Sequence, residues 1–327
     1  MKTGSVVVLW CMLVGELWGQ SQPPVVMLFA GDVTLARHIE TAVGDRTLYV
    51  FQYWKNLPPY DVFMVNLENA VTTSEDKIEK EFNFKMPSKY LDILRDGGVN
   101  IVNVANNHVA DYGRAGIDDT IRNLDSAGIS FVGIGKNLAE ARRPVIKTIK
   151  GKKIGFLGYH GGNSFAATSD STGIAPRFGG YIVADVKRLR PRVDFLVVNF
   201  HWGTEKEIHP EPSQIELAHE VVEAGADLII GHHPHVLQGV ERYHNAVIAY
   251  SLGNFVFGGN SRHTYETAVI KVTLSDKAPT IELLPVRVER WQPKLAKDEI
   301  ALSILDSVRA RSAIFHESLV LEPVVER

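Results

Sequence analysis

The sequence predicts a layered α/β domain, in which buried strands alternate with helices. Short apolar runs rich in valine and isoleucine recur along the 327 residues from Val25 onward, and amphipathic stretches separate several of them. The composition is 45% apolar and 22% charged, with 15 prolines. These values are typical of a globular protein and exclude disordered, collagen-like and coiled-coil classes.

The strands are expected where apolar runs of three to six residues do not alternate with polar ones. This pattern suits strands that are buried on both faces. We expect strands at Val25–Ala30, Val62–Val65, Ile101–Val104, Ile129–Val132, Ile154–Leu157, Phe195–Phe200, Leu228–Ile230 and Val247–Tyr250.

Helices are expected between several of these strands. The stretches Gly113–Ala127 and Gln214–Ala224 are amphipathic. In the second, the apolar residues recur close to the helical period, and Gly225 is a natural stop signal. The order of strands and helices is therefore that of β-α-β units.

The pattern changes in the last quarter of the chain. Ala268–Leu274 and Ile281–Val288 alternate in polarity with no helix between them, so they predict a late antiparallel pair. Asp298–Phe315 predicts a helix packed on the outside. Because no repeat, linker or low-complexity segment is visible, we expect one main domain over residues 22–290 and a C-terminal helical extension over 291–327.

The N-terminus is typical of a secretory signal peptide. Lys2 precedes an apolar stretch of about 11 residues, and the small residues Gly19 and Ser21 follow it. A membrane-spanning helix needs about 20 apolar residues, so this stretch is too short. We expect residues 1–21 to be cleaved, leaving an exported protein that is periplasmic, on the cell surface or secreted. A buried first strand or helix is the alternative.

Charge and cysteine content exclude several classes of function. The 35 basic and 38 acidic residues give a net charge of −3, so no basic excess is available to bind nucleic acid. The single cysteine, Cys11, lies in the segment expected to be removed. The mature chain would then have no disulfide and no thiolate metal site. No other segment is a candidate membrane span.

Polar residues follow the predicted strands at their carboxyl ends. One such residue alone would be a turn former, a helix cap or a buried core histidine. Ligand crevices in α/β sheets lie beyond these strand ends, so several such segments can converge on one site. The six segments are Gly31-Asp32, Asn66-Leu67-Glu68, Asn106-Asn107-His108, His201, Gly231 to His235, and Ser251 to Asn254.

The chemistry of this set points to divalent metal ions. Carboxylate, amide and imidazole ligands without cysteine suit Mn, Fe or Zn, and there are enough ligands for one or two ions. A pair of ions about 3.5–4 Å apart makes a bound water nucleophilic and clamps the oxygens of a phosphoryl or acyl centre. In an extended segment, His233 and His235 would project to the same side.

Other chemistries lack their characteristic motifs. The sequence has no Gly-x-Ser-x-Gly elbow for a serine nucleophile and no phosphate-binding loop ending in Gly-Lys-Ser/Thr. Gly133-Ile134-Gly135 begins like a dinucleotide fingerprint, but Leu138 stands where the third glycine is needed. A glycosidase carboxylate pair cannot be selected from the sequence alone.

Taken in order, these segments resemble the CapA family of poly-γ-glutamate capsule synthesis proteins. The resemblance spans about residues 26 to 260 and implies a four-layer α/β/β/α sandwich similar to the calcineurin-like metallophosphoesterases, with the metal site between the upper loops of two sheets. It is carried by Gly31 to Arg37, Asn66 to Glu68, Asn106 to Gly113, His201 to Glu205, Gly231 to Gly239, and Ser251 to Phe255.

The resemblance also implies roles for individual residues. His108 corresponds to the catalytic histidine of the phosphoesterases, and Glu68 to the acid that bridges their two ions. Thr34 and Val109 stand where the phosphoesterases usually have a histidine and an acidic residue. His232 offers a second alignment of the final histidine motif. The implied metal ligands are Asp32, Glu68, Asn107, His201, His233 and His235, and the candidate substrate-binding residues are Arg37, His232 and Asn254.

Two functions of different classes follow from the resemblance. The first is a metal-dependent hydrolase of phosphoester or amide bonds, acting on the γ-linked glutamate polymer or on a phosphate-bearing envelope component. Arg37 and Arg114 are then candidates to meet anionic groups, or are plain surface arginines. The second is a non-catalytic component of the capsule synthesis and export complex, with synthase proteins as partners and a metal site that is structural or vestigial.

Overall fold

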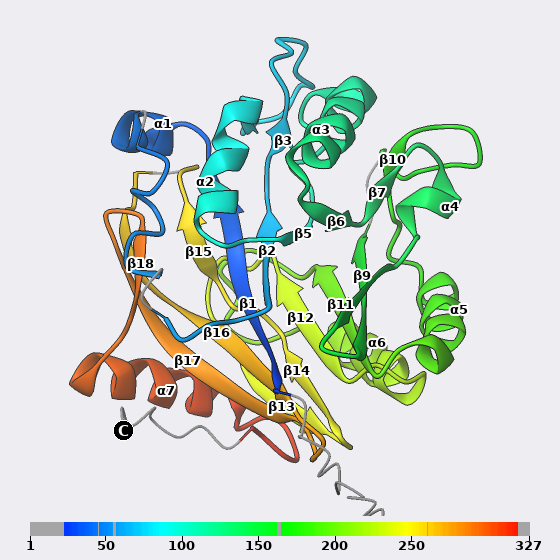
Figure 1. Ribbon diagram of the computed structural model, residues 1–327, viewed down its shortest axis with the longest axis vertical. Coiled ribbons are helices and arrows are strands. Elements are labelled where there is room, and N and C mark those ends of the chain that lie inside the picture. The colour runs from blue at the N-terminus through cyan, green and yellow to red at the C-terminus, as the bar shows by residue number, and fades with distance from the viewer. Residues whose placement is uncertain (1–22, 45, 55–56, 162–164, 260, 320–327) are drawn as a thin grey trace, which may run out of the picture.

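The computed structural model describes residues 23–44, 46–54, 57–161, 165–259 and 261–319. The expected signal peptide, residues 1–21, lies outside these residues, so its cleavage stays a prediction. Within the described ranges, two large sheets lie face to face at the centre of the molecule, and helices cover their outer faces (Figure 1).

The first sheet combines a parallel half with an antiparallel half. Its strand order is β18-β17-β16-β1-β2-β5-β6, and β15 also pairs with β1. The strands β1, β2, β5 and β6 run parallel, whereas β16, β17 and β18 are antiparallel. The bounds are β1 Val25–Thr34, β2 Val62–Leu67, β5 Ile101–Asn103, β6 Ser130–Val132, β15 Asn254–Phe257, β16 Thr264–Leu274, β17 Thr280–Glu289 and β18 Gln292–Leu295.

The second sheet has the order β13-β14-β12-β11-β9-β8, with a parallel centre and antiparallel edges. Its strands are β8 Val145–Ile149, β9 Lys152–His160, β11 Phe195–His201, β12 Leu228–His232, β13 Val240–Tyr243 and β14 Ala246–Ala249. Two small pairs join loops above the sheets, namely β3 Ala70–Val71 with β4 Lys85–Met86 and β7 Ile134–Gly135 with β10 Gly173–Ile174.

Helices flank both sheets. Figure 1 shows α5 and α6 together beside the second sheet and α7 across the bottom of the molecule. Short 3-10 turns, η2 and η3, cover Ser88–Tyr90 and Arg190–Arg192. The helices are α1 His38–Val43, α2 Leu91–Asp96, α3 Gly113–Ala127, α4 Leu138–Ala141, α5 Gly179–Leu189, α6 Pro212–Glu223 and α7 Asp298–Ser312.

Three apolar clusters separate four layers. One lies between the first sheet and helices α1, α2 and α3, and includes Ile39, Leu94 and Ile117. The middle cluster joins the facing sides of the sheets, for example Phe29 with Phe156. The third lies between the second sheet and helices α5 and α6. The α/β/β/α sandwich implied by the family resemblance is therefore confirmed.

The C-terminal segment belongs to the core of this fold. Strand β18 pairs with β17, so the first sheet continues past residue 290. Helix α7 was expected on the outside, but Ile304, Leu305 and Val308 are buried in the middle cluster with side chains of both sheets. The helix therefore closes the lower edge of the space between the sheets.

Candidate metal centre

The polar segments that follow the strands meet between the upper edges of the two sheets. In the first sheet, Asp32 on β1 is paired in register with Asn66 on β2 and with Asn254 on β15. In the second sheet, His201 on β11 is paired with His232 on β12. Parallel register thus places like strand ends side by side, and sheet packing brings the two groups together.

A close approach of two backbone segments fixes the position of Asp32. The backbone N–H of Asp32 donates to the carbonyl of Gly253 at 2.9 Å. A Cβ atom on Gly31 would lie 1.9 Å from that same carbonyl oxygen. Only glycine fits there, and Gly253 itself has a φ of 69°. This packing carries the chain directly into β15 and places Asn254 beside Asp32.

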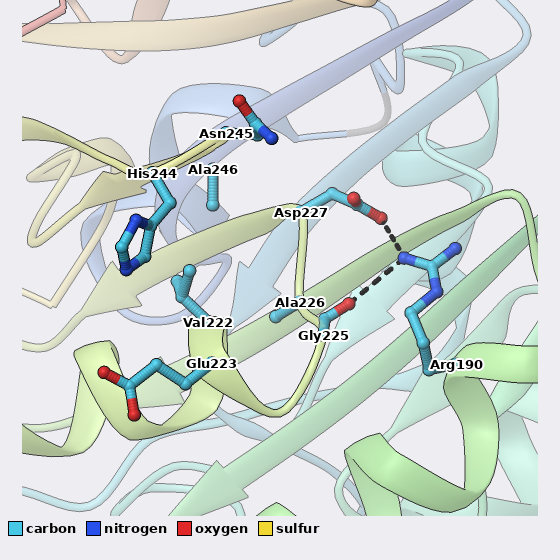
Figure 2. A pocket seen from close by; sticks show the side chains of 9 residues that line it. All are labelled: Arg190, Val222, Glu223, Gly225, Ala226, Asp227, His244, Asn245 and Ala246. Carbon is cyan, nitrogen blue, oxygen red and sulfur yellow. Dashed lines mark hydrogen bonds and ion pairs between the residues drawn. The ribbon is translucent and has the colours of Figure 1, made fainter.

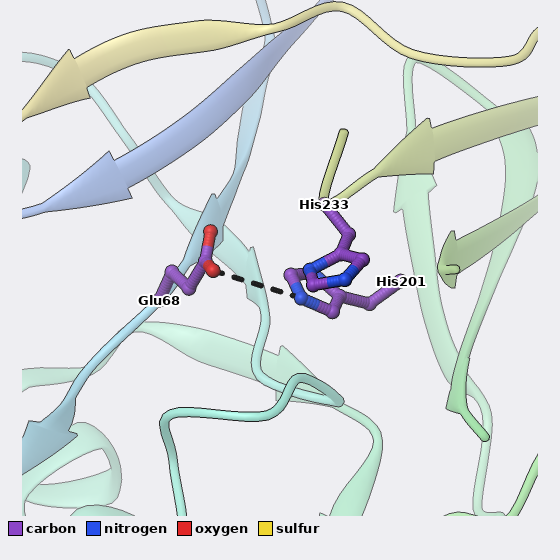
Figure 3. Close-up of side chains that lie close together, drawn as sticks. All are labelled: Glu68, His201 and His233. Atoms are coloured by element: carbon purple, nitrogen blue, oxygen red, sulfur yellow. Dashed lines mark ion pairs between the residues drawn. The ribbon is translucent and has the colours of Figure 1, made fainter. Parts of the chain in front are cut away.

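Glu68 lies at the centre of two groups of candidate metal ligands. One group is Glu68, His201 and His233, and the other is Asp32, Glu68 and His235. Within each group, the ligand atoms lie within 4.8 Å of one another. Figure 3 shows Glu68 extending toward the rings of His201 and His233, and its Oε1 lies 3.6 Å from His201 Nε2.

Asn107 extends the first of these groups. Its Oδ1 lies 2.8 Å from His201 Nε2, the nitrogen that also faces Glu68. Asn107 can therefore add an amide oxygen to the glutamate and the two histidines. All six residues that the resemblance implied as ligands lie in this cluster.

The loop after β12 has a conformation that the sequence did not predict. His233 and His235 were expected in an extended segment, but they have φ values of 98° and 59°. Both side chains still face the cluster. His235 Nδ1 lies 3.1 Å from an Asp32 oxygen, and the ring of His233 lies 4.6 Å from that of His201. Positive φ at non-glycine residues is strained, and such strain is concentrated at functional sites.

Burial and mutual charge shift the pKa values of the acidic and basic groups. Burial alone would raise the pKa of Asp32, but the nearby imidazoles of His232 and His235 hold it below its usual range. Burial raises the pKa of Glu68, and the charge of Asp32 raises it further. Although burial opposes its protonation, the carboxylates of Glu68 and Asp32 raise the pKa of His235 to about 10.

His201 and His233 are held neutral. Burial lowers the pKa of His233 to about 4, and the charge of His235 acts in the same direction. Burial likewise lowers the pKa of His201 well below its usual value. Neutral imidazole is the form that binds metal ions.

Unpaired buried atoms show that these residues fit a metal ion. Asp32 and Glu68 are both 0% exposed. Glu68 Oε1 and His233 Nδ1 are buried without a hydrogen-bond partner. Buried carboxylates and unpaired polar atoms are unfavourable unless a cation or a hydrogen bond compensates them. The oxygen and nitrogen donors together suggest a divalent cation.

His108 lies outside the ligand groups and is oriented by an acid. Its Nδ1 lies 2.7 Å from Asp111 Oδ2, and a carboxylate only accepts, so Nδ1 carries the proton. Lys80 Nζ donates to the other Asp111 oxygen at 2.6 Å. The ring of His108 also packs on Phe84, with 4.4 Å between centroids. Burial lowers the pKa of His108, although Asp111 opposes this.

The candidate substrate residues have different surroundings. Arg37 is exposed and its guanidinium lies over the rings of Phe82 and Phe84. His232 is 1% exposed and its Nδ1 lies 3.4 Å from Asp32, so it faces the carboxylates. Asn254 Oδ1 accepts a hydrogen bond from His235 Nδ1 at 2.9 Å, and so orients that ring.

Arg114 and Thr34, which the sequence analysis also considered, donate hydrogen bonds to backbone carbonyl groups. The guanidinium of Arg114 donates to the carbonyl groups of Ala166 and Thr172. Thr34, which replaces a phosphoesterase histidine, is buried and donates to the carbonyl of Glu68 at 3.2 Å. Thr34 therefore holds the backbone of a ligand residue.

An asparagine network, which the sequence did not identify, supports the ligands. Asn66 Nδ2 donates to Asp32 Oδ1 at 2.8 Å, and Asn66 Oδ1 accepts from Asn103 and Asn106 at 2.9 and 3.2 Å. Asn66 and Asn106 lie in strand-end segments that the sequence singled out. No local sequence pattern marked Lys80 as a functional residue, because it lies in a long loop and contacts Asp111 only in the folded structure.

A hollow lies at the end of β12 opposite to the candidate metal centre. It has a volume of about 480 Å³ and lies between α6 and the turn before β14 (Figure 2). Arg190 is paired there with Asp227 and with the carbonyl of Gly225. Among the described residues, the groups of histidine and acidic side chains close enough to hold a metal ion do not include any residue that lines this hollow.

Comparison with known proteins identifies the family. The family described as "Bacterial capsule synthesis protein PGA_cap" matches residues 26–259. A capsule biosynthesis protein CapA from Bacillus anthracis is 31% identical over 82% of this chain and 68% of its own length. A PGA biosynthesis protein CapA from Bacillus subtilis is also 31% identical, over 83% of this chain and 73% of its own length.

Other matches are more distant. A probable polyglutamine synthesis accessory protein from Mycobacterium tuberculosis is 27% identical over 80% of this chain and 75% of its own length. A solved 5'-nucleotidase from Candida albicans is 10% identical with a TM-score of 0.45, covering 90% of this chain and 60% of that one. Among the described residues, no helix has the length and apolar character needed to cross a bilayer. The match over residues 26–259 and the two relatives at 31% identity show that this chain belongs to the bacterial capsule synthesis protein family, PGA_cap.

Proposed function

We propose that this protein is a metal-dependent hydrolase of phosphoester or amide bonds that acts in poly-γ-glutamate capsule synthesis or export. One observation carries the proposal. Glu68 is shared by two groups of ligands, and its buried Oε1 has no hydrogen-bond partner in the described structure. A bridging carboxylate between two clusters of this composition supports a site for two divalent ions.

The proposed ligands divide between two positions. Asp32, Glu68 and His235 would hold one ion, and Glu68, Asn107, His201 and His233 the other. The donor types suit Mn, Fe or Zn. When bound, such ions supply Lewis-acid stabilisation and lower the pKa of a coordinated water.

His108 would handle the proton of the reaction. Asp111 holds the proton on Nδ1, so Nε2 carries the free lone pair. A proton taken up at Nε2 can pass to the leaving oxygen or nitrogen, or stabilise the charge that develops there. Lys80 and Asp111 keep the ring in this orientation and do not themselves contact the reacting atoms in this proposal.

The relatives suggest the substrate class and the location. Two are named for capsule or PGA biosynthesis, so we propose the γ-linked glutamate polymer or a phosphate-bearing envelope component as substrate. Capsule synthase proteins are the proposed partners. An exported location, periplasmic, at the cell surface or secreted, is part of the same proposal and depends on cleavage of residues 1–21.

Metal analysis combined with hydrolysis assays tests the proposal. The purified protein should contain divalent metal and hydrolyse bis-p-nitrophenyl phosphate or poly-γ-glutamate. Glu68→Gln should lose metal and turnover, whereas the control Glu216→Gln, on the exposed face of α6, should keep both. A folded, metal-loaded protein with no turnover of either substrate would contradict hydrolysis and favour a non-catalytic role in the capsule complex.

A further inference from the structure

Arg177 is a half-buried cation next to the candidate metal centre. It follows β10, and its backbone N–H donates to the carbonyl of His160 at 2.9 Å. His160 is the last residue of β9 and is paired in register with His201 on β11. Arg177 therefore lies at the same sheet edge as the metal ligands, one strand further along.

His160 connects the arginine to the ligand cluster. Its ring centroid lies 5.2 Å from that of His201, and its Nδ1 lies 3.0 Å from the His201 carbonyl oxygen. His201 in turn contacts His233 and Glu68. The contact of Arg177 with His160, and of His160 with His201, therefore connects Arg177 to the ligand cluster.

Gly161 provides the space that the guanidinium occupies. A Cβ atom at this position would lie 2.7 Å from Arg177 Nε and 3.0 Å from an Nη atom. Both distances are shorter than ordinary van der Waals contact, so any larger residue would displace the arginine. The absence of a side chain at residue 161 therefore leaves the space that the guanidinium occupies.

The guanidinium of Arg177 is not directly paired with an acidic group within the described ranges of the chain. No hydrogen bond or ion pair joins it to another described group, whereas Arg142 and Arg190 are paired with Asp185 and Asp227. Burial lowers the pKa of Arg177, with the charge of Glu211 opposing. Glu211 itself accepts from Thr204 Oγ1 at 2.9 Å.

A partly buried cation without a direct partner is unfavourable, because it has lost hydration and gained no hydrogen bond or ion pair in return. The planar guanidinium is suited to bidentate binding of carboxylate or phosphate oxygens. We propose that Arg177, held in the space left by Gly161, binds an anionic group of the substrate next to the scissile bond. The link to a scissile bond rests on the proposed function, whereas anion binding does not.

Calorimetric titration of small anions tests this site without requiring turnover. The probes are inorganic phosphate and γ-linked triglutamate, added to the Mn²⁺-loaded protein. Arg177→Gln should weaken binding of at least one probe by at least tenfold and keep the metal content unchanged. Arg177→Lys, which retains charge but loses the planar fork, should weaken it less. Arg192→Gln, an exposed arginine of η3, is the matched control and should bind as the parent does.

Gly161→Ala supplies an independent test, since its added Cβ displaces the guanidinium without removing it. We expect weaker anion binding, unchanged metal content and an unchanged unfolding temperature. Loss confined to phosphate would identify a phosphate-bearing substrate, and loss confined to triglutamate a carboxylate-bearing one. Parental affinity for both probes in Arg177→Gln and Gly161→Ala would overturn the proposal, even if hydrolysis is confirmed. Because Gly161→Ala keeps the arginine, it also provides the answer if Arg177→Gln fails to fold.

Discussion

Substitution of two adjacent residues, Asn107 and His108, should separate metal binding from proton transfer. Asn107 Oδ1 lies 2.8 Å from His201 Nε2 and so faces the ligand group that contains Glu68, His201 and His233. His108 Nδ1 instead lies 2.7 Å from Asp111. His108→Ala should therefore reduce turnover and keep the metal, whereas Asn107→Ala should lose metal first.

The expected loss of turnover in His108→Ala is that of general acid–base catalysis. Loss of general acid–base help reduces turnover by about 10²–10⁴-fold, equivalent to about 2.7–5.4 kcal/mol of activation free energy. The variant should nevertheless fold. Asp111 keeps hydrogen bonds from Lys80 and from the Phe84 backbone, both at 2.6 Å. Loss of one hydrogen bond to a charged group reduces the free energy of unfolding by about 1.5–3 kcal/mol, less than the about 5–15 kcal/mol of a typical domain.

The assay measures bound metal and steady-state turnover on the same preparations. Metal content by elemental analysis should match the parent in His108→Ala and fall in Asn107→Ala. The metal affinity of Asn107→Ala should fall by more than the about 10–100-fold that is typical when an outer hydrogen-bond partner is lost. Added Mn²⁺ should restore part of the rate in Asn107→Ala and none in His108→Ala. Equal metal loss in both variants would make His108 a ligand and refute this reasoning, and an undiminished rate in His108→Ala would remove it from the mechanism.

Three other outcomes are expected. His201→Ala and His235→Ala should each lower bound metal in elemental analysis and leave the far-ultraviolet circular dichroism unchanged, because these side chains lie at strand ends. Although burial opposes its protonation, Glu68 and Asp32 raise the pKa of His235 to about 10, so metal must displace its proton at pH 7. Mn²⁺ affinity should therefore rise from about pH 6 to 9, with proton release measured by calorimetry in several buffers. Mass spectrometry of the exported protein should show a start near residues 20–22.

Each of these expectations has a control and a contrary result. His316→Ala removes an exposed histidine and should leave the metal content unchanged. Parental metal content in both His201→Ala and His235→Ala would refute the ligand assignment. Metal affinity that does not change between pH 6 and 9 would show that His235 is neutral before metal binds. An exported chain that still starts at Met1 or Lys2 would count against cleavage.

Local patterns predicted most strands of the two large sheets because burial leaves a signature in short stretches of sequence. The helix expected at Gly113–Ala127 has these bounds in the structure. The expected strand Phe195–Phe200 is one residue longer, ending at His201. Edge elements were harder to recognise. Strand β8 has intermediate or exposed side chains throughout, and β18 has only four residues, so neither forms an apolar run.

The sequence by itself determined which residues lie at the strand ends and that their chemistry suits a divalent metal. Only the tertiary structure decided which of these residues lie together in each ligand group. His232 is buried beside Asp32, whereas His233 and His235 turn through positive φ to face Glu68. Asn107 and His201 are 94 positions apart and meet at 2.8 Å. Such contacts depend on the packing of two sheets through the middle apolar cluster, and that packing is a property of the whole chain that no local periodicity encodes.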